Sequence, residues 1–148
     1  MVQWDEAWAW LSVDAGRIKL RLSQKQGLKP WFDTSTDSTA DLRQCWIVPV
    51  NQRLIVTTVN QIHGVSRGAP WVRWTADCPR TIGTPAAFSD KVVAVPTVKG
   101  VIFFDASTGK RSEIGIPYGQ GSVSVACRKS RILILDHEKS RMACYQVE

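Results

Sequence analysis

Histidines and paired carboxylates are the side chains that most often act as general acids and bases, and this sequence offers few of them in a useful arrangement. The chain has two histidines, His63 and His137. His137 falls in a short polar stretch that predicts a hairpin turn, and no nucleophile signature lies near either histidine. The acidic residues at 5–6 and between 33 and 41 are of the kind found on exposed surfaces and in loops. We therefore expect no catalytic residues and no enzymatic activity.

Cysteines bind metals when two of them are closely spaced, and here the spacing is long. Consecutive cysteines lie 33, 49 and 17 residues apart, so none forms a C-x-x-C pair or a zinc-finger pattern. Each lies in or beside an apolar stretch, as free thiols of a reducing compartment do. We expect free cysteines, no metal, no cofactor and a cytoplasmic location. The four residues are Cys45, Cys78, Cys127 and Cys144.

The segment 61–74 carries the candidate contacts for a protein partner. A stretch from Gln61 to Pro70 is expected to be a long loop, and it leads into Trp71-Val72-Arg73-Trp74. An alternating strand would place Trp71 and Arg73 on one face. Loops that deliver Trp and Arg beside a strand are frequent contact sites. The candidate binding residues are Trp71, Arg73, His63 and Arg67.

Basic residues at both ends of the chain support an alternative function, nucleic-acid binding. Lys and Arg can neutralise phosphates, and an exposed tryptophan such as Trp71 can stack on a base. Outward-facing Lys and Arg also protect strands from aggregation, so the pattern is not specific. The residues of this alternative are Arg17, Lys19, Arg21, Arg128, Lys129 and Arg131.

The composition is that of one globular domain over residues 1–148. The net charge is +6, with 44% hydrophobic and 22% charged residues, which excludes disorder of the whole chain. No apolar run reaches the roughly 18 residues of a membrane-spanning helix. The first six residues are acidic where a secretory signal would be basic and then apolar. We expect a protein that is neither exported nor held in a membrane.

A period of two dominates the hydrophobic pattern and predicts an all-β fold. In the segment 17–22, every odd position is basic and every even position is aliphatic, as on the two faces of a strand. Short runs rich in Val, Ile and Phe then recur, separated by compact polar turns that join antiparallel neighbours. Residues 23–42 interrupt this rhythm, and their polar composition predicts a long loop.

The segment from Gly83 to Lys110 resembles a blade of the pyrroloquinoline-quinone-type β-propellers. Family blades begin with Gly-x-Pro, continue through two strands and end in Ala-x-Asp-x-x-Thr-Gly-Lys-x-x-Trp. This sequence departs from the motif at two positions. Phe103 stands where the family has the alanine, and Glu113 stands where it has the tryptophan that docks on the next blade. A second, more divergent unit is suggested over 121–147. The resemblance implies a repeat scaffold without a bound quinone. The matching positions are Asp105, Thr108, Gly109 and Lys110.

Strand counting predicts how the repeats associate. About twelve strands would make about three four-stranded units, fewer than the four to eight blades that usually close a propeller. The faces at the two ends of such an arc need covering, and a second copy of the chain would supply the cover. The principal hypothesis is thus a non-catalytic scaffold that binds a protein or completes a propeller by self-association. A closed β-sandwich or barrel is the alternative fold.

The last two hairpins allow a register to be predicted. If Cys127 faces Arg131 and Asp136 faces Arg141, then Cys144 lies opposite Leu133, which lies opposite Val125. Cys127 and Cys144 would then lie in strands that are not neighbours. A disulfide between them is therefore not expected.

Overall fold

The computed structural model consists of antiparallel strands in four sheets, which confirms the all-β prediction. It describes residues 1–5, 7–14, 17–24, 27–34, 42–68, 70–114 and 122–147. Sheet 1 contains β1 (Val2–Trp4), β2 (Ala7–Asp14), β3 (Arg17–Gln24) and β4 (Gly27–Thr34). Sheet 2 follows a 3₁₀ turn, η1 (Leu42–Gln44), and contains β5 (Trp46–Val50), β6 (Arg53–Thr57), β7 (Gln61–Val65) and β8 (Val72–Asp77).

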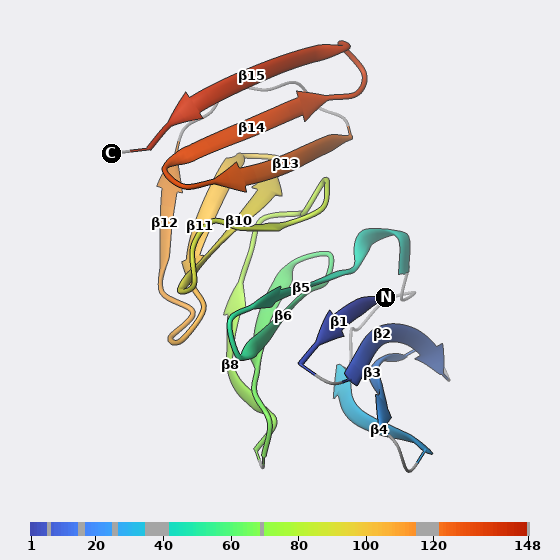
Figure 1. Cartoon of the computed structure of the whole chain (residues 1–148). Helices are drawn as coiled ribbons and strands as arrows, with labels where there is room; N and C mark the ends of the chain where they lie inside the picture. Colours follow the sequence, from blue (N-terminus) through green and yellow to red (C-terminus); the bar gives the residue numbers. More distant parts are fainter. Residues whose placement is uncertain are drawn as a thin grey trace.

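The remaining two sheets complete an arc that Figure 1 shows from sheet 1 to sheet 4. Sheet 3 contains β9 (Ala86–Ala87), β10 (Val92–Thr97), β11 (Gly100–Asp105) and β12 (Arg111–Ile114). Sheet 4 contains β13 (Val123–Arg128), β14 (Arg131–Asp136) and β15 (Arg141–Gln146), and these strands run across the direction of β10–β12 in Figure 1. The expectation of about three units was therefore too low, because the described residues form four sheets.

One expectation for the N-terminal part needs correction and one is confirmed. Half of the predicted loop at 23–42 is strand, since β3 extends to Gln24 and β4 covers Gly27–Thr34. Residues 25–26 and 35–41 lie outside the described part of the chain. The alternation of 17–22 is confirmed, because Ile18, Leu20 and Leu22 are buried at 1% exposure or less. The hydrophobic pattern therefore predicted the faces of β3 correctly, whereas the polar stretches on either side of β4 hid a strand.

Consecutive sheets pack through apolar clusters on their facing sides. Ala9 and Leu22 of sheet 1 meet Leu54 and Val56 of sheet 2. On the opposite side of β6, Ile55 belongs to a cluster that joins sheet 2 to sheet 3. A third cluster joins sheet 3 to sheet 4 and includes an edge-to-face contact between Phe88 and Phe103, with ring centroids 5.1 Å apart. Sheets 2 and 3 are thus covered on both faces.

The register of the last sheet agrees with the prediction in one hairpin and differs in the other. Asp136 pairs with Arg141 and Leu133 with Cys144, as expected. In the preceding hairpin, Arg128 pairs with Arg131, so the partner of Leu133 is Ala126 and not Val125. The difference arises because the turn has two central residues, Lys129 and Ser130, and Lys129 adopts a φ of 55°. None of the four cysteines forms a disulfide, and Cys144 is exposed.

No helix in the described part of the chain combines the length and the apolar composition that crossing a membrane requires.

Candidate functional site

His63, one of the four candidate contact residues, lies in the core of sheet 2. Its side chain is 5% exposed, and its Nδ1 lies 3.0 Å from the hydroxyl of Thr75 on the neighbouring strand. Burial lowers the pKa of His63 from 6.5 to about 4, so the imidazole is neutral at physiological pH. His63 is therefore a core residue and not a surface contact.

Arg67, Trp71 and Arg73 lie together around the connection between β7 and β8. The guanidinium of Arg67 lies 5.3 Å from the centroid of the Trp4 ring and 3.5 Å from a carboxylate oxygen of Asp5, both in sheet 1. Arg73 is exposed and donates a hydrogen bond to the carbonyl of Arg67 at 3.2 Å. Trp71 is half-buried against the cluster between sheets 1 and 2. The contacts of Arg67 thus join two sheets.

The cations of β3 are held by groups within the chain. Lys19 Nζ lies 2.7 Å from Asp14 Oδ2, and Arg21 lies 3.9 Å from the same oxygen. Arg21 also donates a hydrogen bond to the hydroxyl of Ser12 at 3.1 Å. The hydrogen bond from Lys19 holds the pKa of Asp14 below its usual range. Phosphate binding by Lys19 or Arg21 would compete with these contacts, whereas Arg17 is exposed.

The second basic group lies at the opposite end of the arc. Arg128, Lys129 and Arg131 are exposed at the turn between β13 and β14, which is far from sheet 1 in Figure 1. The two basic groups proposed for nucleic acid therefore do not form one continuous surface. Each would have to act alone.

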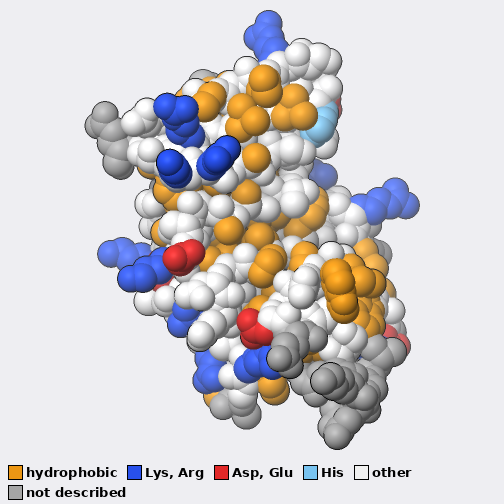
Figure 2. Space-filling model, in the orientation of Figure 1, with side chains coloured by type: hydrophobic (Ala, Val, Ile, Leu, Met, Phe, Trp, Pro, Cys, Tyr) orange, Lys and Arg blue, Asp and Glu red, His pale blue; other side chains and the backbone are white. Residues whose placement is uncertain are grey.

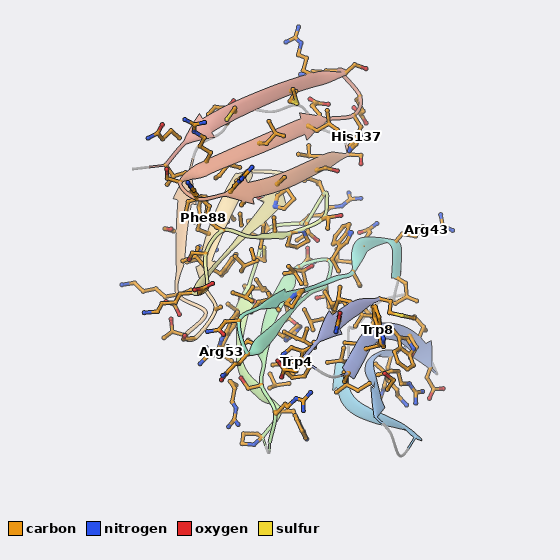
Figure 3. All side chains as sticks on the ribbon, viewed as in Figure 1. Trp4, Trp8, Arg43, Arg53, Phe88 and His137 are labelled. Carbon is orange, nitrogen blue, oxygen red and sulfur yellow. The ribbon has the colours of Figure 1, made fainter. Side chains whose placement is uncertain are left out.

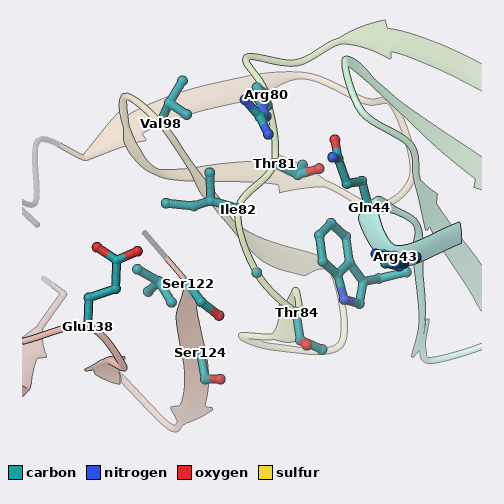
Figure 4. A pocket seen from close by; sticks show the side chains of 13 residues that line it. Arg43, Gln44, Arg80, Thr81, Ile82, Thr84, Val98, Ser122, Ser124 and Glu138 are labelled. Atoms are coloured by element: carbon teal, nitrogen blue, oxygen red, sulfur yellow. The ribbon is translucent and has the colours of Figure 1, made fainter. Parts of the chain in front are cut away.

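A groove of about 640 Å³ lies where segments of sheets 2, 3 and 4 meet. Its walls come from η1 and the start of β5, the segment 80–84, the turn at Val98, the start of β13 and the turn after β14. Figure 4 shows Arg43 and Glu138 on opposite sides of the groove. Three features of its lining are relevant to binding: the cations Arg43 and Arg80, the half-buried ring of Trp46 and the carboxylate of Glu138.

Hydrogen bonds in the backbone and side chains hold these walls in place. The hydroxyl of Thr81 is buried and donates to the carbonyl of Thr58 at 3.1 Å. The amide of Ile82 donates to the carbonyl of Pro96, and the amide of Val123 donates to the carbonyl of Ile82. At the rim, Ser124 Oγ lies 2.7 Å from His137 Nε2. The groove is therefore formed by a connected backbone and is not a gap between independent sheets.

Sequence reasoning did not find this groove, because its residues are brought together only by packing of the sheets. Arg43 and Glu138 are 95 residues apart, and none of the lining segments carries a recognisable motif. In the described part of the chain, no group of three or more His, Cys, Asp or Glu side chains is placed to bind a metal.

Three solved structures share this fold. The computationally designed Ika4 protein is 9% identical over 100% of this chain and 96% of its own, with a TM-score of 0.66. BamB from Moraxella catarrhalis is 15% identical over 89% of this chain and 47% of its own, with a TM-score of 0.53. Apo AztD from Citrobacter koseri is 15% identical over 93% of this chain and 46% of its own, with a TM-score of 0.52.

BamB and AztD are β-propeller proteins, and this chain spans about half the length of each. No protein-family model matches the sequence, and the search of curated proteins gives no match. Because the identities are low, these comparisons bear on architecture and not on activity. The chain has a propeller-like all-β fold made of four consecutive sheets.

Proposed function

We propose that this chain is a binding scaffold that engages an extended, acidic segment of a partner protein in the groove between sheets 2, 3 and 4. The observation that carries the proposal is that two exposed arginines, Arg43 and Arg80, line the same groove as the half-buried Trp46. Arginine forms two-pronged hydrogen bonds with carboxylates, and Trp and Arg are the residues most enriched at protein contacts.

The carboxylate in the groove lining determines where along the groove the acidic side chains of the partner segment can lie. Glu138 lies across the groove from Arg43 (Figure 4) and would repel a carboxylate on that side. An acidic side chain is therefore favoured next to the two arginines and disfavoured next to Glu138. The net charge of +6 adds a long-range attraction to acidic partners.

We further propose that the sheets are repeats of the pyrroloquinoline-quinone type. In sheet 3, the amide of Asp105 donates to the carbonyl of Lys110, and the amide of Ser66 donates to the carbonyl of Trp71 in the same way in sheet 2. These hydrogen bonds align Trp71 of sheet 2 with Lys110 of sheet 3. The family's docking tryptophan follows the motif lysine by three positions, and the residue three positions after Trp71 is Trp74, which contacts the turn after β11 of sheet 3.

A labelled hexaglutamate peptide is the probe for the groove. It should bind the wild-type chain, and the Arg43→Glu, Arg80→Glu double variant should weaken binding at least tenfold, because each charge-assisted hydrogen bond contributes about 1.5–3 kcal/mol. The matched control is Lys110→Glu, Arg141→Glu, which changes the net charge equally at exposed positions outside the groove.

Two outcomes would contradict the groove proposal. If the control variant weakens hexaglutamate binding as much as the groove variant does, the attraction is to net charge and not to this site. If the wild-type chain binds a mixed-sequence oligonucleotide instead, with affinity falling steeply as salt rises, the nucleic-acid alternative gains support.

A further inference from the structure

The two end sheets of the arc differ from the inner sheets in how much of them is covered. In β11, Val101 and Phe103 face sheet 4, while Ile102 and Phe104 face sheet 2. All four side chains are at most 6% exposed. Among the described residues, the apolar cluster of sheet 1 is shared with sheet 2 and that of sheet 4 with sheet 3, so each end sheet has an outward face.

The outward face of sheet 4 is apolar at its centre. In β14, Ile132 and Ile134 are buried against sheet 3, whereas Leu133 and Leu135 on the opposite face are each 37% exposed. Met142, which pairs with Leu135, is 69% exposed. Figure 2 shows hydrophobic side chains over this sheet, with Lys and Arg side chains beside them. The register also puts Arg128 and Arg131 on this face, at one end of it. We refer to its apolar centre as the outward face of sheet 4, which consists of Ala126, Leu133, Leu135, Met142 and Cys144.

The positions on this face correspond to buried positions of sheet 3. Asp105 accepts hydrogen bonds from the amides of residues 107 and 108, and Asp136 accepts from those of 138 and 139. With these aspartates aligned, Leu133 corresponds to Ile102 and Leu135 to Phe104, which are 1% and 0% exposed. The strand β14 therefore has the pattern of a strand covered on both faces.

Corresponding positions in β11 and β14 face opposite directions along the arc of sheets. Ile102 and Phe104 face the preceding sheet, whereas their counterparts Leu133 and Leu135 face away from it. Because both faces of β14 are apolar, either orientation would leave one of them uncovered. The need for a partner therefore does not depend on which face packs against sheet 3.

The outward face of sheet 1 carries two tryptophans, with the cations Arg17, Lys19 and Arg21 on the same face. Trp8 is 50% exposed and Trp10 is half-buried, and both lie on the face opposite to Ala7 and Ala9, which pack on sheet 2. In Figure 3, Trp4 lies at the junction of sheets 1 and 2, whereas Trp8 lies farther from sheet 2. Large aromatic rings and the flexible side chain of Met142 are favourable partners.

We propose that two copies of this chain associate head to tail, with the outward face of sheet 4 of each copy on the outward face of sheet 1 of the other. This arrangement covers both outward faces in each copy around one two-fold axis. Two such copies together would match the length of one BamB or AztD chain, of which this chain covers 47% and 46%. The proposal involves none of the groove residues and can fail independently of the groove proposal.

Light scattering after gel filtration at micromolar concentration tests this association. The wild-type chain should have twice the 16.5 kDa mass of one chain. Leu135→Glu and Trp8→Glu each place a charge on one of the two faces, and both should give the mass of one chain. Gln52→Glu is the control, because Gln52 is exposed on the turn between β5 and β6, outside both faces and outside the groove.

Circular dichroism and a cooperative thermal transition establish that each variant is folded. A wild-type chain with the mass of one copy would overturn the proposal and leave the outward face of sheet 4 to another partner. If Leu135→Glu has the mass of one chain while Trp8→Glu keeps that of two, the sheet 4 faces pair with each other. That outcome would overturn the head-to-tail arrangement.

Discussion

The indole N–H of Trp74 donates a hydrogen bond to the carbonyl of Ala106 at 3.0 Å, which joins β8 of sheet 2 to the turn after β11 of sheet 3. The ring lies between two glycines. A Cβ at Gly64 would lie 2.2 Å from the ring, and a Cβ at Gly109 would lie 2.6 Å from it. The contact therefore depends on the absence of side chains on both sides of the tryptophan.

Gly109→Ala should destabilise the chain by about 2 to 5 kcal/mol in a urea unfolding experiment. A φ of +72° costs an alanine about 1–2 kcal/mol, and displacing the Trp74 ring adds about 1–3 kcal/mol. Gly68→Ala is the control, since it has a φ of +91° but its nearest neighbour lies 3.7 Å away. Equal losses in the two variants would show that the contact with Trp74 contributes nothing.

Ser140→Gly should raise the free energy of unfolding by up to about 1 kcal/mol. Ser140 has a φ of 50° and occupies, in the turn after Asp136, the position that Gly109 occupies after Asp105. Glycine adopts this conformation without steric cost. Thermal unfolding would measure the gain. The matched control is Ser130→Gly. Ser130 is not among the described residues with a positive φ, so glycine should not stabilise the chain there.

His63 should make the stability fall as the pH falls from about 6.5 to about 4. Its pKa is 6.5 when unfolded and about 4 in the folded chain, so the unfolded state binds more protons between these values. The loss is at most about 3 kcal/mol, at 1.36 kcal/mol for each pKa unit. Urea midpoints across this pH range measure it. The same slope in His63→Gln would contradict this assignment.

Cys144 should be the fastest cysteine to react with an aromatic disulfide reagent in the folded chain. Cys144 is exposed, whereas burial raises the pKa of Cys127 to about 11 and that of Cys78 to about 12, which leaves little thiolate at these two sites. Because Cys144 lies on the outward face of sheet 4, its labelling rate should fall as the protein concentration rises. The Leu135→Glu variant should show no such dependence.

The hairpins could be predicted from the sequence because alternation and turn residues act locally. Ile18, Leu20 and Leu22 are buried as their spacing indicates, and the turn after Asp105 closes with Gly109 at positive φ. The strand β4 was missed because Pro30 and the polar stretches on either side of the strand are typical of loops. As an edge strand, β4 tolerates a residue without a backbone N–H.

The sequence did not reveal one local turn conformation, nor most of the features that depend on packing between sheets. The one-residue difference at Lys129 arises because a lysine occupies a conformation that usually requires Gly, Asn or Asp. The groove and the burial of His63 depend on which sheet faces which, and the period of two does not contain that information. The contact made by Trp74 could have been found by comparing sheet 2 with the family motif. Trp74 follows Trp71 by three positions, as Glu113 follows Lys110.

Within each described sheet, the strands lie side by side in the order in which they occur along the chain. No sheet borrows a strand from a distant part of the described sequence, so each can form from its own hairpins with little loss of chain entropy. Stability should then resemble a linear array in which each unit depends on its immediate neighbours. Amide hydrogen exchange should accordingly be slowest at β6 and β11, which are covered on both sides, and fastest in the terminal sheets, where unfolding of the array would begin.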